Sequence, residues 1–441
     1  MNKKIVCIQI SNDLINGKPN LNEISQQYYA TLYNKKHSDG YYKSYHFWEI
    51  PNWISIINYN VDCDFYICKN IEETVNYLLV NNYNYVCFSV LDVNKHIIKD
   101  IIDNYNYEIE EYNFYNCVNE ASKFILGGYI DLFEYFKVCD SSSYIIFNTI
   151  KEFINYLGIE YKLGYDYKHF KDYETIPRLT LSTGCLHNCD FCTIEKELKE
   201  IPINTILQQI KSFEPLKFKL VYINDKTYGQ CQNYKILPNI YRLIKKYNKQ
   251  FKGFIIQTTT TKFLTFENKF IKDAHIKYIE LGIETYNDLI LKKYHKPSSE
   301  KTINLSCDKI RQLKNVWLIP NILIGIPEET ELSYNRTLKF ISQNKDIISH
   351  MNIYNLAVYD NTPLSKKLKY TEADKNENNL NKSFHKDKTI HNNFYVNIHI
   401  LGIDILIYGN KTNEEILNNE TMKELTGLTD SEYNKQCSKK E

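Results

Sequence analysis

The stretch Gly184-Cys185-Leu186-His187-Asn188-Cys189-Asp190-Phe191-Cys192 places three cysteines at the spacing C-x3-C-x2-C within eight residues. A loop this short can point three thiolates toward one centre. Thiolate is a soft ligand that suits iron–sulfur clusters, zinc and copper(I). A four-iron cluster normally takes four cysteines, so three cysteines leave one iron open to another ligand. The stretch therefore predicts a metal centre with Cys185, Cys189 and Cys192 as its ligands.

A structural zinc site is the alternative explanation of the same three thiols. Closed zinc sites take four tetrahedral ligands. His187 lies inside the same tight loop and is poorly placed to be the fourth ligand. The sequence contains no C-x2-C or C-x-H pair elsewhere that could supply one. The spacing favours an iron–sulfur cluster, and a non-catalytic module that holds structural zinc is the competing function.

The loop resembles the signature of the radical S-adenosylmethionine (SAM) superfamily. In that family three cysteines hold a four-iron four-sulfur (4Fe-4S) cluster, and an aromatic residue commonly precedes the third cysteine, as Phe191 does here. The resemblance implies that the open iron binds the amino and carboxylate groups of SAM. It also implies that the reduced cluster cleaves SAM to a 5′-deoxyadenosyl radical, which takes hydrogen from a C–H bond of an unidentified substrate. An electron donor such as flavodoxin or ferredoxin is the expected partner.

From Arg178 onward the pattern indicates strands that alternate with amphipathic helices, one of which carries an apolar stripe over 203–213. The expected strands are Leu179–Ser182, Phe218–Ile223, Phe254–Thr259, Lys277–Ile283, Trp317–Gly325 and Asn352–Tyr359. Such units predict a parallel sheet, here a partial (β/α)6 barrel over 178–365. Barrel active sites lie at the C-terminal ends of the strands. The cysteine loop follows the first strand directly, where such a site belongs.

Three further residues stand at the ends of these expected strands. By the resemblance, Asp225 meets the amino group of SAM, Glu284 binds its ribose hydroxyls, and Gly325 lies beside its adenine in a segment like G-x-I-x-G-x-x-E. A carboxylate suits the ribose because it can accept from two hydroxyls. Glu284 could instead be a charge near a helix N-terminus, and Gly325 could serve a turn. Together with Phe191, these are the expected cofactor-binding residues; the sequence does not identify a catalytic residue.

The first 160 residues also alternate between strand and helix patterns, which predicts a doubly wound α/β domain. The expected strands are Ile5–Ile10, Asp64–Cys68, Tyr85–Leu91 and Phe124–Gly128, and the expected helices are Ile71–Leu79, His96–Ile102 and Ile150–Leu157. This layout resembles the cobalamin-binding-type domain that often precedes a radical SAM barrel.

The histidine motif D-x-H-x-x-G of one branch of cobalamin proteins is absent from this region. Cobalamin binding is therefore possible but not favoured, and methyl transfer is the expected reaction if it binds. The pair Gly127-Gly128 could allow a ligand to approach or could serve close packing or a turn. The region also lacks the cysteine pattern of methylthiotransferases.

Length and composition limit the remaining possibilities. The chain has 441 residues and a net charge of +1, so no overall basic field recruits nucleic acid. It has no apolar run of about 18 residues and begins without a secretory signal, so we expect a cytoplasmic protein with no membrane span. Residues 366–441 form an expected C-terminal extension. We expect a polar linker, a small hairpin or a bent strand around Gly402, and short polar helices.

Overall fold

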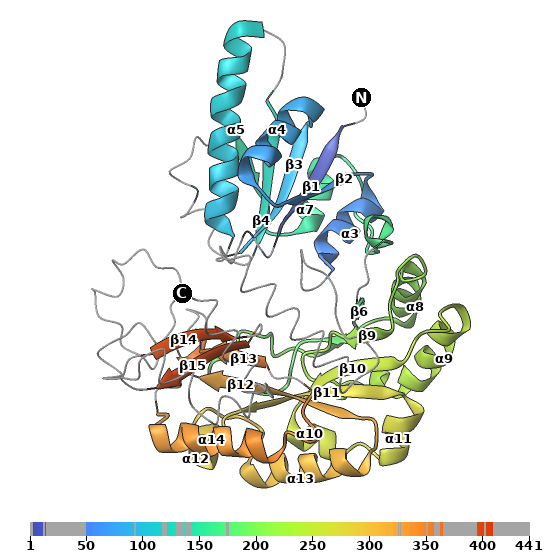
Figure 1. Ribbon diagram of the computed structural model, residues 1–441. Coiled ribbons are helices and arrows are strands. Elements are labelled where there is room, and N and C mark those ends of the chain that lie inside the picture. Colours follow the sequence, from blue (N-terminus) through green and yellow to red (C-terminus); the bar gives the residue numbers. More distant parts are fainter. Residues whose placement is uncertain are drawn as a thin grey trace, which may run out of the picture. The chain divides into compact units, whose positions relative to one another are not determined.

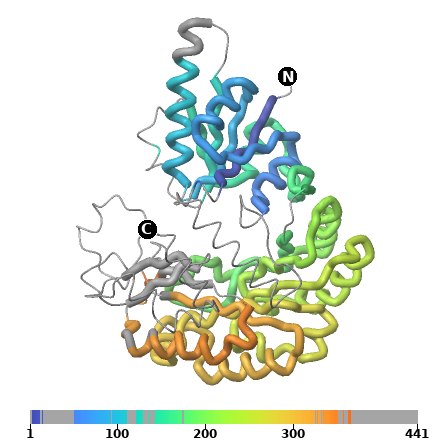
Figure 2. The backbone as a smooth tube through the Cα atoms, in the orientation of Figure 1, coloured from blue at the N-terminus to red at the C-terminus, as the bar shows by residue number. Residues whose placement is uncertain are grey.

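The computed structural model describes residues 3–11, 14, 50–91, 94–116, 121–128, 136, 143–172, 176–324, 326, 328–349, 352–356, 362–364, 395–400 and 403–408. The coloured parts of the tube in Figure 2 all lie within these ranges. The chain divides into two compact units. Among the described residues, the first unit takes the chain up to Pro177 together with 203–218. The second unit takes 178–202 and the chain from Lys219 onward.

The first unit is built on a five-stranded sheet whose paired strands all run parallel. Its strands are β1 (Ile5–Ile10), β2 (Asp64–Cys68), β3 (Tyr85–Val90), β4 (Lys123–Gly128) and β5 (Tyr144–Ile146). The spatial order β2-β1-β3-β4-β5 is a common doubly wound order. The predicted doubly wound sheet is confirmed, and β5 is a strand that the sequence patterns did not indicate.

Helices cover this sheet, and α4 lies beside α5 while α3 lies beside α7 (Figure 1). Their bounds are α3 (Asn52–Asn60), α4 (Ile71–Asn81), α5 (Lys95–Asn116) and α7 (Ile150–Tyr156), followed by the short 3-10 helix η1 (Lys168–Phe170). Helix α4 starts at Asn70, whose side chain accepts from the Glu73 amide, and ends at Asn82 in the left-handed conformation. Helix α3 was not predicted, and α5 extends well beyond its predicted end.

The core of the first unit is formed by apolar side chains of the central strands. Val6, Val86, Phe124 and Leu126 have no measurable exposure. In β1 every residue except Gln9 is buried, as expected of a parallel strand covered on both faces. Burying one such aliphatic or aromatic side chain contributes about 1.5–3 kcal/mol, so the sheet is held chiefly by this core.

The second unit contains a six-stranded sheet, also parallel throughout. Its strands are β6 (Arg178–Leu179), β9 (Leu220–Ile223), β10 (Gly253–Thr258), β11 (Ile276–Glu284), β12 (Trp317–Ile324) and β13 (Asn352–Asn355). They lie in sequence order from β6 at one edge to β13 at the other. Each of the six predicted strands is present, and the sheet is that of a partial barrel.

The helices of the second unit lie along one side of this sheet (Figure 1). They are the 3-10 helix η2 (Gln232–Ile236), α9 (Leu237–Tyr247), α10 (Thr260–Leu264), α11 (Asn268–Asp273), α12 (Asp288–Lys293), α13 (Glu300–Gln312) and α14 (Glu331–Gln343). Capping boxes at Ser299 and Thr330 fix the starts of α13 and α14. Helix α8 (Ile203–Ser212) was predicted within the barrel, but its contacts place it in the first unit.

Near the C-terminus, β14 (Tyr395–Ile400) and β15 (Ile403–Tyr408) pair antiparallel, with Ile400 opposite Ile403. Of the two predicted alternatives, the hairpin is therefore the one that the structure shows. The polar linker and the final short helices lie outside the described residues. Within the described ranges, no helix combines the length and the apolar character needed to cross a membrane.

Candidate functional site

The cysteine loop is closed at its base by a short antiparallel ribbon. Strand β7 (Ser182–Thr183) pairs with β8 (Lys199–Glu200) on the other side of the loop. Gly184 begins the loop with φ +81°, and a Cβ there would stand 1.8 Å from the Glu197 carbonyl oxygen. Because an L side chain would suffer both a strained backbone and a collision, only glycine fits this position.

The three cysteines of the loop are free thiols, and all three are at least partly buried. Cys185 and Cys189 are each 7% exposed, and Cys192 is half-buried. The Cys185 sulfur is 3.3 Å from the hydroxyl of Thr227, which follows β9. The Cys189 sulfur lies 3.8 Å from the carbonyl oxygen of His295, beyond α12. The loop is thus contacted both by the segment that follows β9 and by the segment that follows α12.

The charge environment of Cys189 shows which groups surround the loop. Burial raises the pKa of this thiol to about 11, although the ammonium group of Lys296 opposes the rise. Glu284 and the other two cysteines raise it further, so both of these thiols lie within electrostatic reach of Cys189. Among the described residues, no three His, Cys, Asp or Glu side chains are gathered as the ligands of a single metal ion would be.

Phe191 attaches the loop to a small apolar cluster. Its ring packs against Tyr294 with 6.2 Å between centroids, next to Ile290 and Leu364. The neighbouring Asp190 accepts at its carbonyl from the Leu364 amide at 2.9 Å. Phe191 therefore helps to fix the loop against this cluster.

Asp225 follows β9 and turns its carboxylate to the base of the loop. Its Oδ1 accepts from the amides of Leu181 and Ser182 at 2.8 and 2.9 Å, and its Oδ2 accepts from the Ser182 hydroxyl at 2.7 Å. Burial raises the pKa of Asp225, and these three bonds oppose the rise. They leave about one acceptor position on Oδ2, so most of this carboxylate's capacity ties the second strand to the cysteine loop.

Glu284 is the last residue of β11 and has an unusual backbone. Its φ is +65°, and the pairing of β11 with β12 shifts register between Gly282 and Glu284. Its Oε1 forms an ion pair with the ammonium group of Lys296, and the two side chains are only 11% and 10% exposed. Burial lowers the pKa of Lys296, but Glu284 and Cys189 outweigh this and raise the pKa overall. The lysine therefore stays charged beside the loop.

Two residues near Glu284 were not identified from the sequence. Lys296 contacts Glu284, and its nitrogen also lies 6.0 Å from the centre of the Phe191 ring. Glu329, between β12 and α14, is buried and accepts from the Thr285 hydroxyl at 3.0 Å. In the sequence, Lys296 is marked only by its place twelve residues after Glu284. Glu329 is marked only as part of the acidic pair that follows β12. The predicted Gly325 lies outside the described residues.

His187, predicted from the sequence to be poorly placed as a fourth zinc ligand, is also part of the cysteine loop. Its Nε2 is buried and has no hydrogen-bond partner within the described part of the chain. Burial and then the charges of Lys296 and Lys196 lower its pKa, so the neutral imidazole is favoured. An orphaned polar atom on the cysteine loop fits a place where a further polar group binds.

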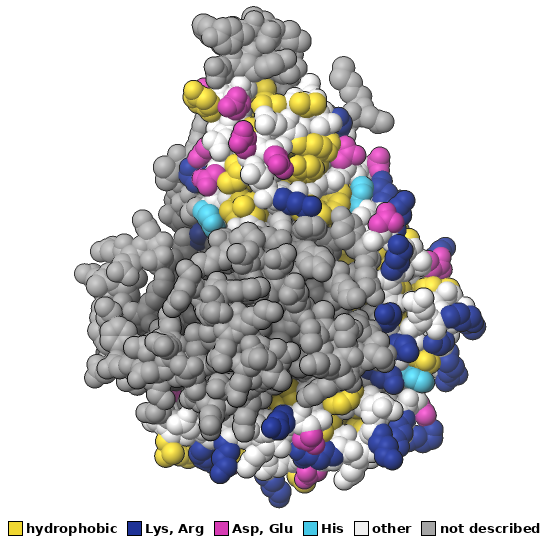
Figure 3. Space-filling model, in the orientation of Figure 1, with side chains coloured by type: hydrophobic (Ala, Val, Ile, Leu, Met, Phe, Trp, Pro, Cys, Tyr) yellow, Lys and Arg dark blue, Asp and Glu magenta, His cyan; other side chains and the backbone are white. Residues whose placement is uncertain are grey.

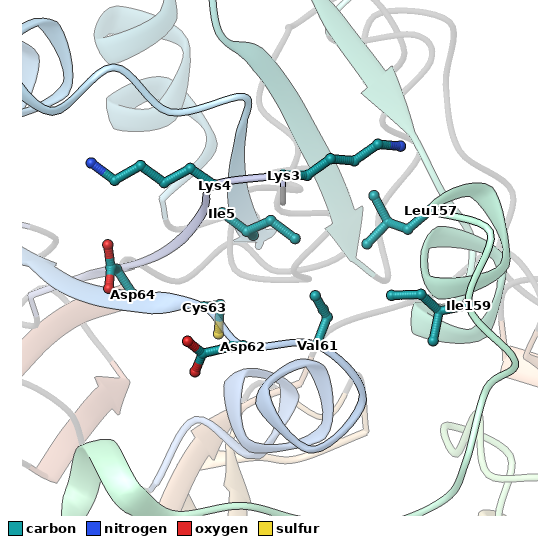
Figure 4. A pocket seen from close by; sticks show the side chains of 9 residues that line it. All are labelled: Lys3, Lys4, Ile5, Val61, Asp62, Cys63, Asp64, Leu157 and Ile159. Atoms are coloured by element: carbon teal, nitrogen blue, oxygen red, sulfur yellow. The ribbon is translucent and has the colours of Figure 1, made fainter. Parts of the chain in front are cut away.

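A separate cavity of about 580 Å³ lies in the first unit. It opens at the amino ends of β1 and β2, where Ile5, Val61 and Leu157 supply apolar walls and Lys3 and Asp62 supply charge (Figure 4). In doubly wound sheets the ligand crevice lies outside the carboxyl ends of the strands. This cavity is therefore at the opposite edge from a cobalamin-type site.

Strand β4 ends in the glycine pair Gly127-Gly128. A Cβ on Gly128 would stand 2.1 Å from the Val90 carbonyl oxygen of β3, whereas one on Gly127 would meet its nearest atom at 3.5 Å. Gly128 thus allows two strands to approach closely. This favours the packing explanation for Gly128 over approach by a ligand.

A parallel partial barrel with a three-cysteine loop at the end of its first strand defines a class of metal-dependent enzymes. The family model of the radical SAM superfamily matches residues 179–341. The predicted resemblance to this superfamily is therefore confirmed for the segment that carries most of the six-stranded sheet.

Individual relatives are distant. The chain is 27% identical over 175 residues to the ribosomal protein uS12 methylthiotransferase RimO of Thermosipho melanesiensis, covering 37% of this chain and 41% of that protein. It is 21% identical over 189 residues to the heme chaperone HemW of Lactococcus lactis, covering 40% and 48%. These matches span less than half of either relative's length.

Two solved structures share the fold over most of the chain. One is the cobalamin-dependent SAM radical enzyme OxsB with aqua-cobalamin bound, with a TM-score of 0.54 at 13% identity, covering 86% of this chain and 64% of that one. The other is the radical SAM methyltransferase TsrM from Kitasatospora setae, with a TM-score of 0.52 at 9% identity, covering 83% and 74%. At these identities the likeness concerns the fold alone.

Proposed function

We propose that this protein is a radical SAM enzyme in which Cys185, Cys189 and Cys192 hold the 4Fe-4S cluster and Glu284 binds SAM. One observation carries the proposal. The buried ammonium group of Lys296 pairs with Glu284 and influences the thiol of Cys189. The expected SAM-binding carboxylate and the expected cluster ligands, far apart in the sequence, therefore share one neighbour.

The residues present fit the cluster. Three free thiols stand on one short loop that Gly184 allows to close, and an orphaned imidazole nitrogen lies beside them. When bound and reduced, the cluster supplies the electron that cleaves SAM and so starts C–H chemistry on the substrate. The polypeptide positions this chemistry and shields it from water.

Each surrounding side chain has a separate task in this proposal. Glu284 accepts from the ribose hydroxyls of SAM, and the ion pair with Lys296 holds that carboxylate in place. Asp225 chiefly fixes the base of the cysteine loop and offers its last acceptor position to the SAM amino group. Phe191 anchors the loop at its other end, and Gly325 remains the proposed neighbour of the adenine.

The test is the formation of 5′-deoxyadenosine from SAM by the anaerobically reconstituted, dithionite-reduced full chain. Wild type should form it, and the Cys185→Ala, Cys189→Ala and Cys192→Ala variants should not. Cys307→Ala, which removes a buried thiol of α13 in the same unit, is the matched control and should retain the activity. Activity in all three loop variants would rule out the assignment.

Methyl transfer with bound cobalamin is the second candidate. It is favoured by the fold shared with OxsB and TsrM, whose structures are described as containing cobalamin. We infer that any cobalt would not be histidine-ligated, because the sequence lacks the D-x-H-x-x-G motif. Anaerobic incubation with hydroxocobalamin followed by desalting decides the matter: near-stoichiometric retention supports this candidate, and loss of the cobalamin absorbance excludes it.

A further inference from the structure

Glu329 is a buried acid that has an incomplete set of hydrogen bonds. Glu329 is 5% exposed, and its Oε1 accepts from the Thr285 hydroxyl at 3.0 Å. Its Oε2 is buried and has no partner among the described residues. A buried polar atom left unsatisfied costs about 1–3 kcal/mol, so its presence here calls for an explanation.

The contacts of Glu329 lead to the residues that follow Glu284. The hydroxyl of Thr285 binds Glu329, and the amide of Tyr286 donates to the Thr337 hydroxyl of α14 at 3.0 Å. The hydroxyls of Thr285 and Thr337 are themselves 3.4 Å apart. The loop before α14 and the first turns of α14 thus hold the two residues directly after Glu284.

These hydrogen bonds lie next to the strained backbone of Glu284. A non-glycine residue with φ +65° costs about 1–2 kcal/mol, and such strain persists only where the surroundings enforce it. Lys296 holds the Glu284 side chain from one direction. The bonds to Thr285 and Tyr286 hold the chain on the other side of the bend.

We propose that Glu329 is a positioning residue that, by binding Thr285, keeps the backbone of Glu284 bent so that its carboxylate faces SAM. This inference rests on the proposed role of Glu284 in SAM binding. Burial raises the pKa of Glu329 to about 8, so its neutral form predominates at neutral pH. A glutamine has nearly the same shape and reproduces the acceptor that Thr285 uses.

The test measures the dissociation constant of SAM by calorimetry on the anaerobically reconstituted full chain, with iron content determined for every variant. Glu329→Leu and Thr285→Val should each weaken SAM binding about 3- to 10-fold, the effect of one neutral hydrogen bond. Glu329→Gln should stay within about twofold of wild type. If Glu329→Leu does not fold, Thr285→Val carries the test.

A double variant distinguishes positioning from a general loss of stability. Glu284→Gln alone should weaken SAM binding about 10- to 150-fold, as the loss of a charged acceptor does. Adding Glu329→Leu to it should weaken binding little more, because the contact that Glu329 supports is already lost.

Each other result would contradict part of this account. Fully additive losses would mean that Glu329 acts independently of Glu284, which overturns the inference. An effect of Glu284→Gln without any effect of Glu329→Leu or Thr285→Val would also overturn it, while leaving the proposed function intact. Unchanged SAM affinity in Glu284→Gln would remove Glu284 from the site and refute both proposals.

Discussion

At the scale of single residues, the site depends on a few side chains whose importance comes from contacts between distant parts of the chain. The cysteine loop, Glu284 and Asp225 could be proposed from the sequence, because each follows or ends a strongly patterned strand. Lys296 and Glu329 could not, because a lysine and an acidic pair in a loop look like ordinary solvated charges. Only folding brings Lys296 to Glu284 and turns Glu329 inward to Thr285.

Gly184→Ala should prevent the cysteine loop from closing. The new Cβ would meet the Glu197 carbonyl oxygen at 1.8 Å, and φ is +81°. Gly158→Ala is the matched control, because its φ is +80° with nothing within 4 Å, so it carries only the backbone cost of about 1–2 kcal/mol. Iron content after anaerobic reconstitution should fall sharply in the first variant alone. Equal iron in both would show that the loop tolerates a side chain at Gly184.

Glu329→Gln should stabilise the protein increasingly as the pH rises. Folding raises the pKa of Glu329 from an ordinary 4.5 to about 8, so the unfolded state releases its proton first and wild type loses stability between these two values. The gap between variant and wild type in the free energy of unfolding should therefore grow from pH 6 to pH 9, by about 3 kcal/mol at most. Urea unfolding at both pH values measures it, and a constant gap would mean that Glu329 is ionised at both.

At the scale of elements, strands were predicted better than helices and assignments to units. Short apolar runs with polar flanks indicate strands, which is why β1 and β2 have the predicted bounds, although only β1 is largely buried. Helix α3 was missed because it starts after Pro51 without a side-chain cap. Helix α8 covers the residues of the predicted apolar stripe. It nevertheless belongs to the first unit, where Phe213, just beyond its end, packs against Tyr167. Periodicity gives an element's type, and the surfaces it buries decide its unit.

Gly128→Ala should destabilise the first unit, because its Cβ would stand 2.1 Å from a backbone oxygen of β3. Overpacking of this kind costs about 1–3 kcal/mol. The neighbouring Gly127→Ala has room at 3.5 Å and should be neutral or slightly stabilising, since glycine is unfavourable within a strand by about 0.5–1 kcal/mol. Thermal unfolding of the two variants compares them directly. A lower midpoint for Gly127→Ala than for Gly128→Ala would contradict the close approach of β3 and β4.

At the scale of the whole molecule, the fold class followed from the sequence while the reaction did not. Two alternating strand–helix regions predicted α/β structure in both parts of the chain, and a parallel sheet is present in each. The substrate could not be predicted, because the residues that would line its pocket come from several strand ends and carry no common pattern. The central claim is therefore the nature of the metal centre, which the three thiols determine.

The most direct test of that claim is the amount of iron, acid-labile sulfide and zinc per chain in the anaerobically reconstituted protein. The account predicts about four irons and four sulfides for wild type, as expected of a 4Fe-4S cluster, and loss of both in Cys185→Ala, Cys189→Ala and Cys192→Ala. About one zinc per chain without sulfide would contradict it and identify the loop as a structural zinc site.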